Sequence, residues 1–132
     1  MSNFYDLEVW KKCREFRKDI RKITKTFPPE EKYQLVDQLK RSSRSTTANI
    51  AEGFGRFHYQ GNILFCRQAR GSLSESLDHL ICAFDEEYIS KETLNNLKEQ
   101  YELCLKILNG YILFLQKQKD VDSNKKSKKD EE

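Results

Sequence analysis

Glycine and proline are scarce in this sequence. It has 5 glycines and 2 prolines among 132 residues, and the two prolines are adjacent, at positions 28 and 29. A β-sandwich or barrel needs turn residues roughly every 8–12 positions, which this chain does not supply. Helices are therefore the expected secondary structure.

Long apolar runs and catalytic or metal-binding motifs are also missing. No stretch approaches the ~20 apolar residues that span a bilayer, so we expect a soluble protein with no membrane partner. The sequence holds no P-loop, no G-x-G-x-x-G and no H-E-x-x-H motif. Its two histidines, His58 and His79, lack a nucleophile at a characteristic spacing. We predict that the protein is not an enzyme and has no catalytic residue, metal site or cofactor.

The 4 cysteines form no C-x-x-C pair, and we recognise no secretory leader. Disulfides are rare in the reducing cytoplasm, where free cysteines behave as small apolar side chains. We therefore expect a cytoplasmic protein with free, buried or half-buried thiols.

Apolar residues recur at steps of three and four along four segments, which is the spacing of one helix face. The first predicted helix begins after Asn3 or Asp6 and ends near residue 27, and the other three span about 29–55, 60–87 and 90–121. The serine- and threonine-rich middle of the second segment has poor helix propensity, but the periodicity continues through it, so we predict helix there too. Short connections make neighbouring helices antiparallel, which predicts an all-α, antiparallel up-down-up-down four-helix bundle.

Residues 1–121 are the predicted bundle, and residues 122–132 are predicted to form a disordered charged tail because they contain no apolar residue to bury. We expect a glycine of Gly53-Phe54-Gly55 to end the second helix in the left-handed conformation. Gly71 costs the third helix up to about 1 kcal/mol relative to alanine, which suggests that another helix packs closely against it.

Two polar clusters have a predicted structural role. Asn49 and Glu52, at the end of the second helix, are expected to bond to loop backbone or to a facing helix. Glu75, in the third helix, is expected to form an ion pair with Arg41 or Arg44.

Basic residues concentrate in the first two helices. Residues 1–56 carry 13 Lys/Arg and 8 Asp/Glu, whereas residues 57–89 carry 2 and 5. The candidate nucleic-acid-binding residues are Arg14, Arg17, Arg21, Lys40, Arg41 and Arg44. Such residues would bind phosphates without regard to sequence and with strong salt dependence. The alternatives are an ordinary solvated face, since no base-reading motif is present, or charge complementarity across an oligomer interface.

Short motifs follow one another in order between residues 4 and 115. They are Phe4, Leu7-Glu8-Val9-Trp10, Phe27-Pro28, Gln38-Leu39-Lys40-Arg41, Asn49-Ile50-Ala51-Glu52-Gly53 and Ala69-Arg70-Gly71-Ser72-Leu73-Ser74-Glu75. This ordered set resembles the bacterial four helix bundle protein family, also called the 23S rRNA intervening-sequence protein family. The motif positions that we single out are Asn49, Glu52, Gly53, Gly71, Ser72 and Glu75.

The resemblance implies an up-down bundle that assembles into a ring-shaped homo-oligomer, a homopentamer. The accessory variability determinant of diversity-generating retroelements is similar to this family and is a basic partner of reverse transcriptase and nucleic acid. RNA or DNA is therefore an implied partner, and a reverse transcriptase is another if the chain comes from a retroelement. Arg44 and Thr46 depart from the family pattern, which is usually apolar there, and make the second helix more basic.

Taken together, the residues and the resemblance predict a non-enzymatic, oligomeric binding module that acts as a nucleic-acid-associated adaptor. The alternative is a self-associating protein–protein scaffold that binds no nucleic acid. In that case aromatic residues near the helix ends, such as Tyr5, Phe54, Phe57 and Tyr59, would cover the subunit contacts.

Overall fold

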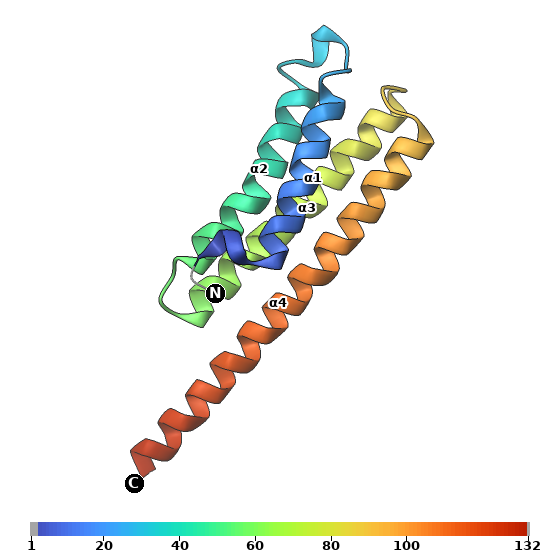
Figure 1. The fold of residues 1–132 in the computed structure, drawn as a ribbon. Helices are drawn as coiled ribbons and strands as arrows, with labels where there is room; N and C mark the ends of the chain where they lie inside the picture. The colour runs from blue at the N-terminus through green and yellow to red at the C-terminus, as the bar shows by residue number, and fades with distance from the viewer. Residues whose placement is uncertain (1–2, 132) are drawn as a thin grey trace.

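The computed structural model describes the backbone of residues 3–131 and the side chains of residues 3–129, and its helices are joined by short connections (Figure 1). In chain order the elements are η1 (Phe4–Asp6), α1 (Glu8–Thr24), η2 (Pro29–Glu31), α2 (Leu35–Phe54), α3 (Tyr59–Asp85) and α4 (Lys91–Glu131), where η marks a 3-10 helix. The described residues contain no strand. The predicted all-α class is confirmed.

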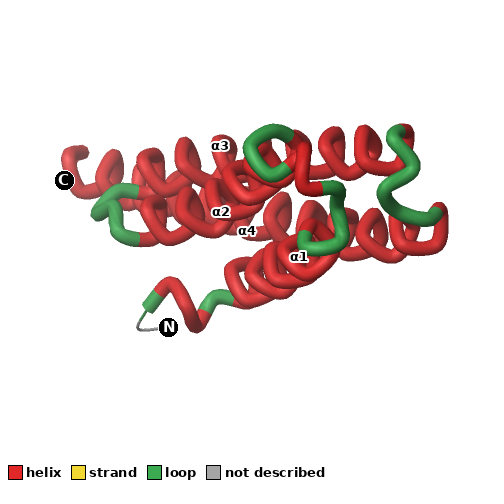
Figure 2. Tube along the Cα trace, turned by 90° about the horizontal axis from the view of Figure 1, so that it is seen from above, coloured by secondary structure: helices red, strands yellow, loops and turns green. Residues whose placement is uncertain are grey.

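The four long helices alternate in direction and form one bundle. Helix α1 packs on α2, α2 on α3 and α3 on α4, and α4 in turn packs on α1. Figure 2 shows the helices lying side by side, and Figure 1 shows the connections at the ends of the bundle. This is the predicted up-down-up-down arrangement.

The core lies along the shared axis of the four helices, and every helix contributes to it. Its large, fully buried side chains are Phe16, Ile20, Leu39, Ile50, Leu73, Leu80 and Leu108. Burying such a side chain stabilises the fold by about 1.5–3 kcal/mol relative to leaving it in water. The periodic apolar residues identified in the sequence therefore supply the cohesion of the bundle.

The connection between α1 and α2 is longer than the sequence predicts. Pro29 begins only a single 3-10 turn, and α2 starts at Leu35 rather than at the proline. The Glu31 carboxylate accepts a hydrogen bond from the Leu35 backbone N–H at 3.0 Å. This side chain satisfies a donor at the start of α2 that has no partner within the helix, which sets where the helix begins.

The end of α2 also differs from the prediction. Gly55 has a φ of −74°, in the right-handed region, so the expected left-handed glycine cap is wrong. The Gly55 N–H bonds to the Ala51 carbonyl at 3.2 Å, which continues the helical pattern and requires no left-handed residue. The left-handed residue lies elsewhere: Glu87, just after α3, has a φ of 65°.

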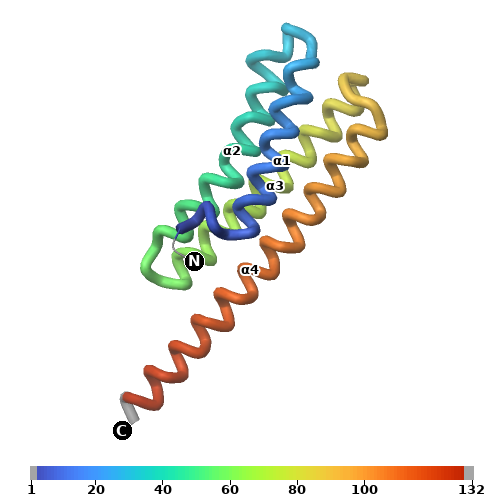
Figure 3. The backbone as a smooth tube through the Cα atoms, viewed as in Figure 1, coloured from blue at the N-terminus to red at the C-terminus, as the bar shows by residue number. Residues whose placement is uncertain are grey.

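Helix α4 continues well past the other three helices (Figure 3). Its last buried residue is Leu115, and residues 120–129 are all exposed. The structure describes residues 122–131, predicted to be a disordered tail, as the last turns of α4; residue 132 lies outside the described residues. A helix satisfies its own backbone hydrogen bonds, so this extension forms without a core to pack against.

Candidate nucleic-acid interface

A groove runs between α1 and α2, and basic side chains from both helices line it. Its volume is about 150 Å³, and its lining residues are Arg17, Lys18, Ile20, Arg21, Lys40, Ser43 and Arg44. Residues three or four apart on a helix share one face, and α1 lies directly against α2. The groove therefore gathers five cations, and no acidic side chain is among its described lining residues.

Arg17 is the most restrained cation of the groove. Its guanidinium Nη1 donates a hydrogen bond to Thr47 Oγ1 of α2 at 2.7 Å, so the side chain bridges the two helices. Burial lowers the pKa of Arg17, and the positive charges of Arg14 and Arg44 lower it further. The guanidinium is thus crowded by like charge and would interact favourably with an anion.

The other basic side chains of this region differ in how they are held. Arg21 Nη1 donates to Thr24 Oγ1 at 3.1 Å, and Arg14 lies over the Trp10 ring at 5.7 Å from its centroid. Among the described residues no ion pair involves Lys40 or Arg44. Their charges are therefore available to a ligand.

Arg41 does not belong to this group, although the sequence placed it there. Its Nε is 3.0 Å from Asp37 Oδ2 in an i,i+4 ion pair, and it lines a separate hollow with Glu31 and Glu86. One residue along a helix turns the side chain by about 100°, which carries Arg41 away from the face of Lys40. Conversely, the sequence-based set missed Lys18, which shares the α1 face of Arg14 and Arg21.

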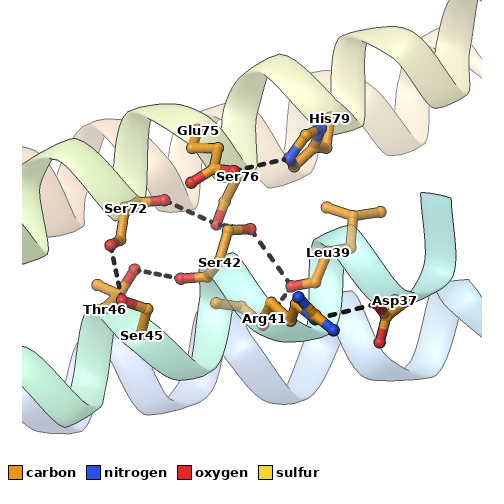
Figure 4. A network of polar contacts seen from close by, with 11 residues as sticks. Asp37, Leu39, Arg41, Ser42, Ser45, Thr46, Ser72, Glu75, Ser76 and His79 are labelled. Carbon is orange, nitrogen blue, oxygen red and sulfur yellow. Dashed lines mark hydrogen bonds and ion pairs between the residues drawn. The ribbon is translucent and has the colours of Figure 1, made fainter. Parts of the chain in front are cut away.

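Small hydroxyl side chains join α2 to α3 on the other side of α2 (Figure 4). Ser76 Oγ donates to Ser42 Oγ at 2.8 Å, and the hydroxyl oxygens of Ser45 and Ser72 are 2.9 Å apart. Thr46 bonds to the carbonyl of Ser42 within α2. Every described buried side-chain nitrogen or oxygen has a hydrogen-bond partner. This serine- and threonine-rich stretch is helical, as predicted.

The motif residues at the end of α2 have structural roles. Asn49 Nδ2 donates to the carbonyl of Ser45 at 2.9 Å, within its own helix, and Glu52 pairs with Arg56 at 2.8 Å. The sequence analysis predicted that these two side chains bond to loop backbone or to a facing helix. Among the described residues, neither side chain makes such a bond. A Cβ atom on Gly53 would lie only 2.7 Å from Asn62 Oδ1. Gly53 is therefore where α2 and α3 approach each other closely.

The motif residues in α3 correct two predictions. A Cβ on Gly71 would meet nothing within 4 Å, because Gly71 faces outward, so it mediates no close packing within the chain. Glu75 Oε1 is 3.2 Å from His79 Nε2 and pairs with neither Arg41 nor Arg44. The i,i+4 neighbour His79 lies on the same helix, whereas Arg41 is held by Asp37 (Figure 4).

The remaining chemically reactive side chains form no assembled centre. The 4 cysteines are free; Cys82 is exposed and the other three are buried. A hydrogen bond with Cys104 and burial both raise the pKa of Cys13. No group of three or more His, Cys, Asp or Glu side chains within residues 3–129 is placed to hold a metal ion. Among the described helices, none is both long and apolar enough to cross a membrane.

Comparison with known proteins identifies relatives of this architecture. The family model described as "23S rRNA-intervening sequence protein" matches residues 5–110. A crystal structure from Bacteroides thetaiotaomicron, described as a protein with unknown function from the S23 ribosomal protein family, is similar, with a TM-score of 0.73 and 26% sequence identity. The match covers 79% of this chain and 94% of that chain. No curated protein matches.

Proposed function

The chain belongs to the 23S rRNA-intervening sequence protein family, and we propose that it is a cytoplasmic, non-enzymatic binding module that associates with RNA or DNA through the groove between α1 and α2. The name of the family refers to a sequence that intervenes in 23S rRNA and does not state a biochemical activity. The proposal therefore rests on the groove itself.

The observation that carries the proposal is a cluster of cations without compensating acids. Arg17, Lys40 and Arg44 line one groove, and burial, followed by the like charges of Arg14 and Arg44, lowers the pKa of Arg17. Polyanion phosphates would relieve this repulsion and release their own condensed counterions, which drives binding at low salt. A structural ion-pair network would instead have placed carboxylates in the groove, as occurs beside Arg41.

The contacts available in the groove favour backbone binding over base recognition. Its basic side chains suit phosphate oxygens, and the described residues offer no recognition helix of a known DNA- or RNA-binding motif. We expect weak dependence on sequence and strong dependence on salt.

The test is an RNA titration at two salt concentrations with the wild-type chain and the triple variant Arg17→Gln, Lys40→Gln, Arg44→Gln. Each phosphate contact contributes about 0.7–0.9 to the slope of log affinity against log salt, so the triple variant should lower that slope by roughly 2–3. Arg41→Gln is the matched control, because Arg41 has the same charge on the same helix but lies outside the groove. Absence of binding by the wild type at low salt, or equal slopes for wild type and triple variant, would overturn the proposal.

A self-associating scaffold without nucleic acid is the second candidate function, and exposed aromatics favour it. Phe57 is fully exposed and Tyr5 is 52% exposed, whereas Phe54 and Tyr59 are partly buried against the core. The homopentameric ring implied by the resemblance is part of both candidate functions. Light scattering should then give five times the 15.7 kDa of one chain. A monomer at micromolar concentration would contradict it.

A further inference from the structure

A second hollow lies beside the basic groove, at the start of α1, and aromatic side chains contribute to it. The hollow has a volume of about 730 Å³, and Tyr5 and Trp10 line it together with Arg14, Arg17 and Lys18. We call it the aromatic hollow. Arg17 and Lys18 also line the groove between α1 and α2. These two cations therefore form a common border between the aromatic hollow and the basic groove.

The position of Tyr5 is set by the turn that precedes α1. Asn3 Oδ1 accepts a hydrogen bond from the Phe4 N–H at 2.9 Å, and the Asp6 carboxylate accepts one from the Asn3 N–H at 3.2 Å. Leu7, which follows this 3-10 turn, is buried. The Tyr5 side chain, 52% exposed, thus projects from a backbone that is already ordered, which lowers the entropy cost of binding a ligand there.

Trp10 is also oriented by its own chain. It is partly buried against the core, and the Phe4 ring meets it at 68° with ring centroids 5.3 Å apart. Phe4 meets the Tyr5 ring in the same edge-to-face manner, at 5.5 Å. Contacts of this kind stabilise aromatic pairs beyond their buried area. Trp10 is therefore held in place while part of its ring still lines the aromatic hollow.

Cations follow Trp10 along one face of α1. Steps of four, three and four residues lead from the ring to Arg14, Arg17 and Arg21, so these side chains share a face of the helix. The row spans about 17 Å at 1.5 Å per residue. Arg17 is fixed at its centre by the hydrogen bond to Thr47 Oγ1 at 2.7 Å. A polyanionic strand along this face would meet the aromatic ring and the cations in succession.

The charge in the aromatic hollow is predominantly positive. Lys11 and Glu15 complete its lining, and Glu15 Oε2 is 3.5 Å from Lys12 Nζ, so its acid has a partner. The Arg14 guanidinium lies 5.7 Å from the centroid of the Trp10 ring, and no ion pair within the described residues involves it. A flat aromatic group that carries a phosphate would suit both the ring and the cations, and a nucleotide has both parts.

We propose that the aromatic hollow receives one unpaired base of a single-stranded nucleic acid, stacked on Trp10, while the adjoining phosphates pass Arg17 into the basic groove. Arg14, which is exposed and lies over the ring, covers the other face of the base. The inference rests on the proposed function, because the groove binds the strand that carries the base. It names single-stranded RNA or DNA as the class of ligand.

Stacking explains how the chain selects single strands without reading a sequence. Every base has an aromatic face, so a stacking site accepts all four bases. In a duplex the faces of each base are covered by its neighbours, and reaching them requires the base to leave the stack. The hollow therefore favours unpaired bases, whereas the phosphate contacts of the groove are open to any strand.

The first test uses the fluorescence of Trp10, which is the only tryptophan of the chain. A single-stranded RNA oligonucleotide is compared with an abasic ribose–phosphate strand of equal length and charge and with an RNA duplex. The strand with bases should quench Trp10 and bind roughly 5- to 150-fold more tightly than the abasic strand. The abasic strand should bind with a similar salt slope, and neither it nor the duplex should quench Trp10.

The abasic strand separates the two proposals. If it binds as tightly as the strand with bases and neither quenches Trp10, the stacking inference is wrong and the groove proposal stands. If no strand binds at low salt, the groove proposal has failed and the inference fails with it. Equal quenching by the duplex would also contradict the selection of single strands.

The second test removes the flat rings one at a time. Trp10→Leu keeps an apolar side chain against the core and should weaken single-strand binding about fivefold or more, with no change for the abasic strand. Tyr5→Leu retains the Trp10 signal and should weaken both the quenching and the binding, so it decides the question if Trp10→Leu does not fold. Tyr33→Leu is the matched control, since Tyr33 is 82% exposed but borders the hollow of Arg41. Wild-type affinity of Tyr5→Leu and of folded Trp10→Leu for the single strand would overturn the inference.

Discussion

Helix α2 faces α3 on one side and α1 on the other, and polar side chains line both sides. Toward α3 they are neutral hydroxyls with partners, such as the Ser42–Ser76 pair at 2.8 Å. Toward α1 they are cations, such as Lys40 and Arg44, in a groove that contains no described acid. The first side holds the fold together and the second retains an unbalanced charge. Polar side chains therefore stabilise the fold where they have hydrogen-bond partners, and they offer a binding surface where their charge is not compensated.

The largest expected loss of stability comes from a substitution that separates α2 from α3 at Gly53. The change Gly53→Val places a branched side chain where a Cβ alone would lie 2.7 Å from Asn62 Oδ1 and 3.0 Å from the Asn62 carbonyl. We expect the free energy of unfolding to fall by about 3 kcal/mol, because overpacking forces the backbone apart. Urea denaturation measures this. An unchanged midpoint would mean that α2 and α3 are not as close as described.

A smaller loss of stability is expected when a single hydroxyl is removed from the contact between α2 and α3. Ser76→Ala removes the donor to Ser42 Oγ and should lower the free energy of unfolding by about 1–2 kcal/mol. The double change Ser42→Ala, Ser76→Ala should recover part of that loss, since two apolar side chains leave no unpaired group. Additive losses in a double-mutant cycle would show that the two hydroxyls do not interact.

On the α1 side of α2, we expect a substitution to raise the free energy of unfolding instead of lowering it. Arg44→Gln removes a positive charge that disfavours ionised Arg17, so the free energy of unfolding should rise by a few tenths of a kcal/mol. The gain should disappear in 1 M salt, where charges are screened within about 3 Å. A loss of stability at low salt would show that Arg44 is compensated after all.

The smallest effect on stability is expected only in alkaline solution, just before the start of α2, where the Glu31 carboxylate has hydrogen-bond partners. The Tyr88 hydroxyl donates to Glu31 Oε1 at 3.0 Å, and burial together with this carboxylate raises the pKa of Tyr88 to about 12. The unfolded phenol ionises near pH 10, so Tyr88 should make stability fall as pH rises from about 10 to 12. Thermal melts should show a weaker fall for Tyr88→Phe over that range; identical profiles would contradict the contribution.

The sequence was sufficient to predict the four helices because their signal is local. Apolar residues at steps of three and four predicted one buried face on each helix, and Phe16, Ile20 and Leu39, which lie on such faces, are fully buried. The serine-rich part of α2 was also predicted correctly, since its flanks keep the helical period. The helix ends were less predictable, because they depend on single side-chain bonds such as the Glu31 carboxylate on the Leu35 N–H.

The candidate site was predictable only in part, because side-chain partners depend on rotation about each helix axis. Composition identified the basic character of α1 and α2 but did not separate Arg41 from Lys40. The i,i+4 spacing of Asp37 and Arg41 was a local signal that could have excluded Arg41. By contrast, nothing in the sequence distinguishes Gly53, which is held against Asn62, from Gly71, which is open. That difference arises only when α2 and α3 pack together.

Cys13 of α1 interacts with Cys104 of α4, the two helices farthest apart along the chain, and both thiols are buried. Their contact joins the first and last helices of the bundle, so forming it carries a larger loop-closure entropy cost than a contact between helices that are neighbours in sequence. The rate at which a small reagent alkylates these two buried thiols would therefore report how often α1 transiently separates from α4. The exposed Cys82 would react at once and serve as the internal reference.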